Sequence, residues 1–252
     1  MYSIFITGTA GSGKSLLTSV LVPWFVEKGS NVITVNLDPG VISLPYNPDV
    51  DIRDYINIDD LMERYQLGPN GALILSADMV ATRLPEIQEE IDEIGPDYAI
   101  IDTPGQLELF AYRESGTYVV KNISADARAV IFLFDASLVS TSTNYVSVAL
   151  LAASIRLMLE SPQIAVLSKR DLVGESWKSM VRWSSRLAEL EAELRKESNS
   201  ESYLLAKGIM TNLAKIGLTS ELLPVSAATN EGIVELSAAL SRVFRGGEEM
   251  EG

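Results

Sequence analysis

The feature that most constrains the fold of this chain is a short glycine-rich segment close to its start. It reads Gly8-Thr9-Ala10-Gly11-Ser12-Gly13-Lys14-Ser15 and matches, without mismatch, the phosphate-binding pattern of Gly, four residues and Gly-Lys-Ser. Residues 2–7 are typical of a strand, and residues 16–26 have the apolar spacing of a helix. In that context the glycines let N–H groups point at phosphate oxygens, and the helix adds the positive end of its dipole. The segment predicts a nucleoside triphosphate site.

The last two residues of this motif carry its chemistry. We expect Lys14 to reach the β- and γ-phosphates and the Ser15 hydroxyl to complete a Mg²⁺ coordination shell. The alternative is a glycine-rich turn with a chance Lys-Ser pair, which the flanking strand and helix disfavour.

Composition limits the chemistry that remains. The chain has 252 residues, 47% of them hydrophobic, which is enough for one large domain, and we assign residues 1–245 to it. Its 34 acidic and 20 basic residues give a net charge of −14, which argues against a general nucleic-acid surface. Because the sequence has neither cysteine nor histidine, thiolate chemistry, zinc fingers and histidine-based catalysis are excluded. Catalysis would use carboxylates, amides, hydroxyls, lysine or a hard metal ion.

The sequence also bears on location. The first residues enter a predicted strand with no basic segment before an apolar one, so we expect no secretory signal. The most apolar long segment, residues 146–159, is interrupted by Arg156 and is shorter than a bilayer span. We therefore expect a cytoplasmic protein without a membrane partner.

Predicted strands alternate with helical patterns along the chain. Apolar or β-branched runs typical of buried strands occur at 31–37, 98–101, 129–134, 164–167 and 222–225. Strand–helix–strand units place such strands in parallel with right-handed crossovers. The predicted fold is α/β, a doubly wound, mainly parallel sheet of the P-loop NTPase type.

Several helical segments have a predicted place in this fold. Residues 76–94 are expected to form one amphipathic surface helix. Residues 140–160 are apolar most of the way round, so this helix is either deeply packed or shared with a partner chain. A helical insertion at about 174–219 precedes the last strand and is expected to hold two helices with a bend at 198–202. Residues 246–252 read as an acidic tail.

Carboxylates follow two of the predicted strands. Asp38 comes directly after the strand at 31–37, at the sheet edge where ligands bind in open α/β folds, which favours a role near Mg²⁺ or water. Asp102 ends the next strand and is followed by Thr103-Pro104-Gly105-Gln106. In a nucleotide hydrolase the carboxylate of Asp102 would hold Mg²⁺ directly or through water, the Gly105 N–H would approach the γ-phosphate, and Gln106 would orient the attacking water. The candidate metal ligands are Ser15, Asp38 and Asp102.

The five aspartates within residues 49–60 lie between Asp38 and Asp102 in the sequence, and their interpretation is simpler. We expect helix-start and solvent-facing positions, and no metal cluster, for Asp49, Asp51, Asp54, Asp59 and Asp60.

Two later segments concern the choice of base. Ser168-Lys169-Arg170-Asp171 resembles the guanine-reading motif of GTPases, in which Asn or Thr usually stands first. The aspartate of that motif accepts two hydrogen bonds from guanine, whereas adenine has no such donor pair and would leave Asp171 unpaired. Ser168 keeps a hydroxyl but has less reach, which bears on the contact that braces the loop more than on the base. Ser226-Ala227-Ala228 resembles the last GTPase motif, whose backbone N–H contacts the guanine oxygen.

Residues 67–71, Leu-Gly-Pro-Asn-Gly, have the composition of a tight turn. Glycine and Asn-Gly would supply positive φ and proline would fix it, which predicts a rigid reversal. Turn chemistry alone assigns it no function.

The order of these motifs resembles the GPN-loop GTPase family. The resemblance rests on Gly68-Pro69-Asn70, placed between a P-loop with Asn36-Leu37-Asp38-Pro39 downstream and the segment Asp102–Gln106. Similar segments continue through 51–54, Leu109-Phe110 and 226–228, so the likeness covers most of the chain, and the insertion matches loosely.

This resemblance implies a homodimer that binds GTP and GDP with Mg²⁺. The Gly-Pro-Asn loop would reach the partner subunit's phosphate site, where the Asn70 amide would contact the terminal or released phosphate. Asp38, Asp102 and Gln106 match the family's positions for metal and water handling, and which of them acts as base stays open because a neutral glutamine can only orient. The family also implies an assembly or chaperone-like role with a protein client, which the sequence does not identify.

Three other functions compete with a dimeric GTPase switch. A partitioning-type ATPase carries a lysine after the first P-loop glycine, where this chain has Thr9. A small-molecule kinase needs an acceptor site and often an arginine-rich lid, and the insertion has arginines but no convincing lid pattern. A scaffold with structural GTP would bind tightly and hydrolyse negligibly.

Overall fold

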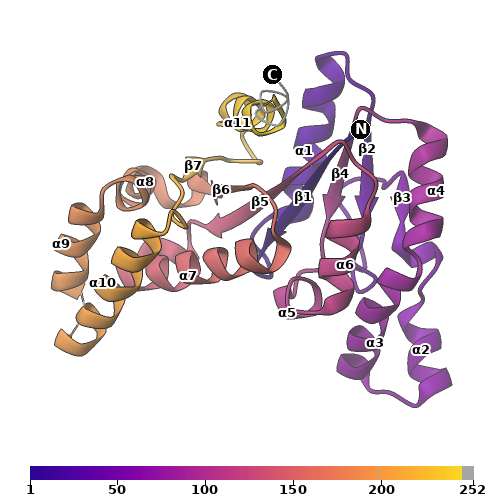
Figure 1. Ribbon diagram of the computed structural model, residues 1–252, viewed down its shortest axis with the longest axis horizontal. Helices are drawn as coiled ribbons and strands as arrows, with labels where there is room; N and C mark the ends of the chain where they lie inside the picture. The colour runs from indigo at the N-terminus through magenta and orange to yellow at the C-terminus, as the bar shows by residue number, and fades with distance from the viewer. Residues whose placement is uncertain (198, 246–252) are drawn as a thin grey trace.

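The central sheet is built from the apolar runs of the sequence. The computed structural model describes residues 1–197 and 199–245. In this part of the chain seven strands form one sheet in the order β3-β2-β4-β1-β5-β6-β7, with neighbouring strands parallel (Figure 1). The strands are β1 (Tyr2–Gly8), β2 (Val32–Asn36), β3 (Val50–Asp51), β4 (Tyr98–Asp102), β5 (Ala127–Asp135), β6 (Gln163–Ser168) and β7 (Leu223–Pro224). The prediction of a doubly wound, mainly parallel α/β sheet is confirmed.

Helices connect the strands and cover both faces of the sheet. The α-helices are α1 (Lys14–Glu27), α2 (Ile58–Tyr65), α3 (Pro69–Thr82), α4 (Leu84–Ile94), α5 (Leu107–Phe110), α6 (Glu114–Asn122), α7 (Ser142–Leu159), α8 (Trp177–Ser185), α9 (Leu187–Glu197), α10 (Ser200–Lys215) and α11 (Ile233–Arg245). Short 3-10 helices are η1 (Ile52–Asp54), η2 (Leu138–Ser140) and η3 (Arg170–Ser176).

The alternation of side chains in β1 divides the core into two layers. Ile4 and Ile6 face a layer that contains the buried residues of α1 and α11, whereas Phe5 faces the layer packed against α2 to α10. Because successive side chains of a strand point to opposite faces, one fully buried strand serves both layers.

Parallel pairing brings the ends of the strands to one edge. Ile6 pairs with Asp102, Asp102 pairs with Asn36 on the other side, and Asp135 pairs with Ser168. The carboxyl ends of β1, β2, β4, β5 and β6 therefore meet where the glycine-rich segment leaves β1, as expected for a ligand site in an open α/β sheet.

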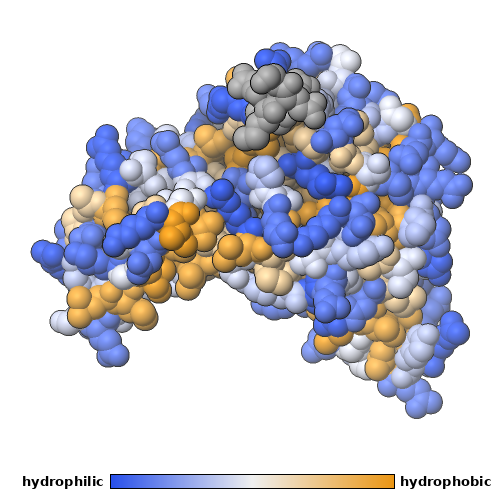
Figure 2. All heavy atoms as spheres, in the orientation of Figure 1, coloured by the Kyte–Doolittle hydropathy of each residue, from blue (hydrophilic) through white to orange (hydrophobic). Residues whose placement is uncertain are grey.

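The long apolar helix α7 is partly packed and partly open. Half of it is buried inside the fold, while Leu150 is 45% and Leu157 is 64% exposed. Figure 2 shows hydrophobic surface where α7 and α10 lie, and an open groove there is lined by Leu150, Leu204, Leu205 and neighbouring residues. α7 begins at Ser142 and has 18 residues, so its length and composition alone would allow a membrane span, as those of a buried core helix also can. The expectation that this segment is too short is therefore wrong.

The segment predicted as a tight turn is the start of a helix. Gly68 is extended, with φ −73° and ψ 169°, and precedes Pro69 at the first position of α3. The positive φ lies earlier, at Gln66, which ends α2 with φ 53°. Proline has no N–H to donate and a φ suited to a first helical turn, so it begins a helix here instead of closing a reversal.

The helix predicted over 76–94 is two helices, α3 and α4, which meet at Arg83. Pro85 lies in the first turn of α4, where its missing N–H costs nothing, but it cannot continue the hydrogen-bonding of α3. The insertion between β6 and β7 holds three α-helices where we predicted two, because the extended backbone of Arg186 separates α8 from α9. β3 has two residues and was not predicted, and the predicted acidic tail at 246–252 lies outside the described residues.

Substitution of Phe132 by alanine tests the central position of β5. Its side chain is fully buried and contacts Phe134 edge-on at 5.3 Å between ring centroids. We expect the free energy of unfolding to fall by about 3–5 kcal/mol in urea titrations. The matched control is Leu204→Ala, which removes a side chain that is 66% exposed and should change it by about 0.5 kcal/mol or less. Equal losses for the two variants would contradict this description of the core.

Candidate active site

The phosphate loop joins β1 to α1 in the predicted place. A Cβ on Gly8 would lie 2.7 Å from Ser12 Oγ and 2.9 Å from Leu133 Cβ, so no side chain fits there. Gly13 has φ +96°, which strains any other residue, and its carbonyl accepts the first α1 hydrogen bond from Leu17 at 2.9 Å. Both glycines are therefore required by the shape of the loop.

Lys14 is buried against this loop. Its Nζ donates to the carbonyl oxygens of Gly8 and Thr9, each at 3.2 Å. Burial lowers the pKa of Lys14, and the charges of Asp102 and Asp38 oppose that shift. The ammonium group thus lies between the loop carbonyls and two carboxylates, as a group that reaches phosphate oxygens should.

Asp102 is the last residue of β4 and is also buried. Its Oδ2 accepts a hydrogen bond from the Tyr46 hydroxyl at 3.0 Å, while its Oδ1 is buried and has no hydrogen-bond partner among the described residues. Burial raises the pKa of Asp102, against the effect of the neighbouring Ser15 and Tyr46 hydroxyls and of Lys14. An unpartnered buried carboxylate oxygen is costly unless a ligand satisfies it.

That oxygen makes the site suitable for a hard cation. Ser15 supplies a hydroxyl beside the Asp102 carboxylate, and Mg²⁺ prefers oxygen ligands of these types. The residues present fit the predicted Mg²⁺ shell, with Asp38 as the second carboxylate near Lys14.

Asp38 is held in an unexpected arrangement. Its Oδ2 accepts a hydrogen bond from the Gly105 N–H at 3.2 Å, and its Oδ1 accepts one from the Gly40 N–H at 2.9 Å. The Gly105 amide is the donor that the sequence predicts for the γ-phosphate. In this structure a carboxylate of the preceding loop occupies that donor.

A second polar network supports the loop that carries Asp38. Asn36 accepts from the Asp38 N–H at 3.0 Å and donates to Asp51 Oδ1 at 2.9 Å, and Arg53 pairs with the same Asp51. Asp51 is thus a helix-start acid, as predicted, but it is not solvent-facing, because its side chain is 12% exposed.

Ser168 braces the phosphate loop despite its short side chain. Its hydroxyl donates to the Ser12 carbonyl at 2.8 Å and lies 3.3 Å from the Phe134 carbonyl. The shorter reach compared with asparagine is therefore sufficient, because the end of β6 lies close to the loop. Lys169 pairs with Asp135 at 2.7 Å, and its stem lies along Gly13.

A cavity of about 220 Å³, called the base cavity below, lies between the phosphate loop and the two segments that resemble guanine-reading motifs. Its lining includes Ser12 and Gly13 from the loop, Lys169 and Asp171 after β6, and the segment 227–228 after β7. Thus the residues that resemble guanine-reading motifs share one cavity with the phosphate loop, although they come from distant parts of the chain.

Two predicted elements are not part of this cluster. Gly68, Pro69 and Asn70 are exposed at the start of α3, and Figure 1 shows the α2–α3 connection well away from the end of β1. Gln106 is exposed at the start of α5, and in the described part of the chain no hydrogen bond joins its amide to another predicted site residue.

Sequence reasoning missed two residues that contact the site. Asp135 follows the predicted strand at 129–134, so the rule that selected Asp38 and Asp102 could have found it. Tyr46 lies in an irregular loop, and no local pattern indicates that its hydroxyl reaches Asp102.

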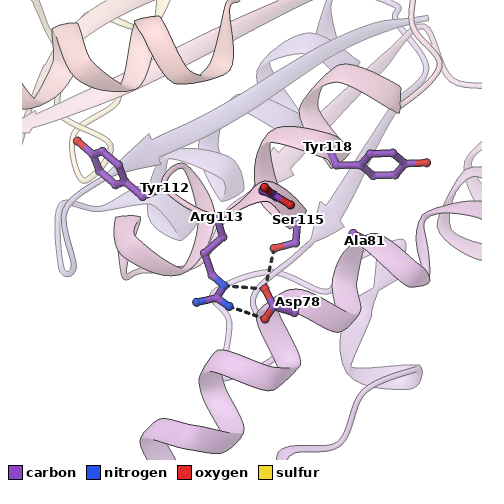
Figure 3. A pocket seen from close by; sticks show the side chains of 7 residues that line it. Asp78, Ala81, Tyr112, Arg113, Ser115 and Tyr118 are labelled. Carbon is purple, nitrogen blue, oxygen red and sulfur yellow. Dashed lines mark hydrogen bonds and ion pairs between the residues drawn. The ribbon is translucent and has the colours of Figure 1, made fainter.

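A wider, open cavity of about 610 Å³ lies elsewhere, between α3 and the start of α6 (Figure 3). Arg113 and Asp78 form an ion pair at its centre, Ser115 donates to the same carboxylate, and Tyr112 and Tyr118 flank it. No residue of the phosphate loop lines this cavity. It connects α3, the helix that begins with the Gly-Pro-Asn segment, to α6.

Comparison with known proteins gives a consistent assignment. A family model described as a conserved hypothetical ATP binding protein matches residues 6–245. The chain is 31% identical to GPN-loop GTPase 3 of Candida glabrata, over 98% of this chain and 93% of that protein. It is 29% identical to GPN-loop GTPase 3 of Mycosarcoma maydis, over 99% and 94%. A crystal structure of a GTPase in apo form from Pyrococcus abyssi is similar with a TM-score of 0.84 and 31% identity, covering 97% of each chain.

The substitution Asp171→Asn tests the assignment of the base cavity. An asparagine amide keeps one acceptor oxygen but places its NH2 group against one of the two guanine donors, whereas xanthine offers a carbonyl at that position. We expect affinity for GTP to fall by roughly tenfold to a hundredfold, since an unsatisfied buried polar group costs about 1–3 kcal/mol, and affinity for XTP to rise.

Titration calorimetry with GTP, XTP and ATP measures this change. Glu175→Gln is the matched control, because it removes an acid from the same 3-10 helix that is 80% exposed. Unchanged GTP preference in the Asp171 variant, or ATP bound as well as GTP by the parent protein, would show that Asp171 does not read guanine.

Proposed function

This chain belongs to the GPN-loop GTPase family and hydrolyses GTP to GDP and phosphate, and we propose that it does so as a Mg²⁺-dependent homodimeric switch. The observation that carries the dimer is that Gly68, Pro69 and Asn70 are exposed at the start of α3 and, among the described residues, form no hydrogen bond with the phosphate loop of their own chain.

The start of α3 is suited to a phosphate on another molecule. Gly68 has no side chain to cap the helix, so the N–H groups of Asn70 and Gly71 and the positive end of the helix dipole are presented outward. In the proposed dimer this helix end and the Asn70 amide contact the terminal phosphate in the partner subunit's site.

Within one chain the roles follow the geometry of the strand ends. Lys14 would bind β- and γ-phosphate oxygens, and Ser15, Asp102 and Asp38 would hold Mg²⁺ directly or through water. When bound, the ion neutralises the charge that develops on those oxygens. Gln106, which is neutral, orients the attacking water, and Asp38, whose carboxylate lies beside the Gly105 amide, accepts the proton of that water.

In this proposal, the hydrogen bond between the Gly105 amide and Asp38 depends on whether GTP or GDP is bound. A γ-phosphate that accepts a hydrogen bond from Gly105 N–H displaces the carboxylate, whereas GDP leaves it in place. The loop of Asp38 would therefore take different positions with GTP and GDP, which would change dimer geometry and the binding of a client.

The cellular part of the proposal is broader. We place the protein in the cytoplasm, with an assembly or chaperone-like role toward a protein client and without membrane or direct nucleic-acid binding. The net charge of −14 supports the last point, because a nucleic-acid surface requires excess basic residues.

Mixing two inactive variants tests the action of Asn70 across the dimer. Asn70→Ala and Lys14→Ala should each lose most GTPase activity as homodimers, because each lacks one component of every site. A mixed dimer regains one intact site, with Lys14 from one chain and Asn70 from the other, so partial activity should return on mixing. Turnover is measured at a mixed-dimer population verified by native mass spectrometry, with Asn122→Ala as a control for an exposed asparagine of another helix. No rescue at that population would end the model of action in trans.

The substitution Asp38→Asn tests the link between Gly105 and the γ-phosphate. With Mg²⁺ chelated, so that the proposed metal role of Asp38 is absent, removal of the carboxylate charge near the γ-phosphate should raise the affinity for a non-hydrolysable GTP analogue relative to GDP by about fivefold, as expected for about 1 kcal/mol of repulsion. With Mg²⁺ present, hydrolysis should fall. Fluorescent-nucleotide titrations give the ratio, and Asp54→Asn, an exposed acid nearby, is the control. A lower GTP-to-GDP ratio in the Asp38 variant would mean that the carboxylate assists γ-phosphate binding.

A further inference from the structure

We propose that Arg170 is a positioning residue for guanine recognition, which holds the base-reading loop, the Ser226 loop and the helical insertion in one arrangement. Arg170 stands between Lys169 and Asp171, both of which line the base cavity, but it does not line the cavity itself. The inference rests on the proposed assignment of this cavity to guanine.

Two contacts of Arg170, one from its backbone and one from its side chain, join the two loops that form the cavity. The Arg170 N–H donates to the Val225 carbonyl at 3.3 Å, and its guanidinium donates to Glu231 from Nε at 3.1 Å and from Nη2 at 2.9 Å. Val225 lines the base cavity. Backbone and side chain of one residue thus bind the loop after β6 to both ends of the loop after β7.

The loop after β7 is closed at the residue that Arg170 binds. The Ser226 N–H donates to the Glu231 carbonyl at 2.9 Å, and the Ser226 hydroxyl accepts from the Thr229 N–H at 3.1 Å. Because Ala227 and Ala228 lie within this closed loop, an arginine that holds Glu231 also fixes the amides that face the base. The pair with Arg170 keeps the pKa of Glu231 below its usual range, so the glutamate stays charged.

The third contact reaches the insertion. The Arg170 guanidinium lies 5.2 Å from the centre of the Trp177 ring, and Trp177 is the first residue of α8. A planar guanidinium can stack on an aromatic ring while its edge binds a carboxylate, which lysine cannot do. Through this contact Arg170, whose side chain is 21% exposed, connects the insertion to the segments that line the base cavity.

Loss of the Arg170 contacts should change nucleotide affinity and base preference more than the rate of hydrolysis. Without the guanidinium, Asp171 and the Ala227–Ala228 amides keep their chemistry but lose their fixed separation. Loss of one partly exposed ion pair and its ring contact should weaken nucleotide binding by about threefold to fivefold. Among the described residues, no hydrogen bond or ion pair joins the guanidinium to the phosphate loop, so kcat should stay within about twofold.

The experiment compares Arg170→Met, which retains the stem, with Arg170→Lys, which retains the charge. We expect the methionine variant to raise KM for GTP and Kd for GDP by about threefold to fivefold and to reduce the preference for GTP over ITP, which lacks the exocyclic amine. The lysine variant should recover part of both effects. Arg186→Met removes an exposed arginine that pairs with Glu189 in the same insertion, and it should leave both quantities unchanged.

Two outcomes would overturn the inference. The first is a folded Arg170→Met protein with the parental preference for GTP over ITP, and the second is an equal change in Arg186→Met. The Asp171→Asn protein separates this inference from the identity of the cavity. If that variant changes base preference and the Arg170 variants do not, positioning by Arg170 is wrong; if neither does, the cavity does not read guanine.

Discussion

The hydrogen bond from the Ser168 hydroxyl to the Ser12 carbonyl joins the two halves of the nucleotide site. On one side of it lies the phosphate loop, in which Lys14 also donates to the carbonyl oxygens of Gly8 and Thr9. On the other side lies the loop that carries Lys169 and Asp171. The Thr103 hydroxyl makes a similar bond, at 2.8 Å, to the Ile6 carbonyl just before the loop. The phosphate loop is thus held in shape from β4 and from β6, and the distance between this loop and the base cavity is set by the spacing of strands in the sheet.

The sequence predicts this half of the molecule well because the relevant signals are local. A motif of eight residues identifies the loop, and parallel strands bring Asp38, Asp102 and Ser168 to the same edge without any need to know their contacts. The same rule, applied once more, would have found Asp135. Tyr46 is different, since its approach to Asp102 depends on the path of an irregular loop, which no periodicity describes.

The Gly68–Gly71 segment shows where local chemistry is ambiguous. Glycine, proline and asparagine in succession suit a turn and also suit a helix start, and the two differ in the backbone angles of a single residue. The positive φ falls on Gln66, a residue without turn propensity, because the end of α2 requires it there. The helix count of the insertion failed for a related reason, since the extended Arg186 interrupts an apolar periodicity that continues on both sides of it.

The place of β1 in the sheet has a consequence for how the protein is made. β1 lies between β4 and β5, so the strand synthesised first pairs with segments that begin at Tyr98 and Ala127. At roughly 5 to 20 residues per second, this apolar strand waits several seconds on the ribosome for its neighbours. Its strand pairings are all distant in sequence, which makes the sheet slow to form and the waiting strand prone to pair with other chains. A protein of this design would benefit from a chaperone during its own synthesis.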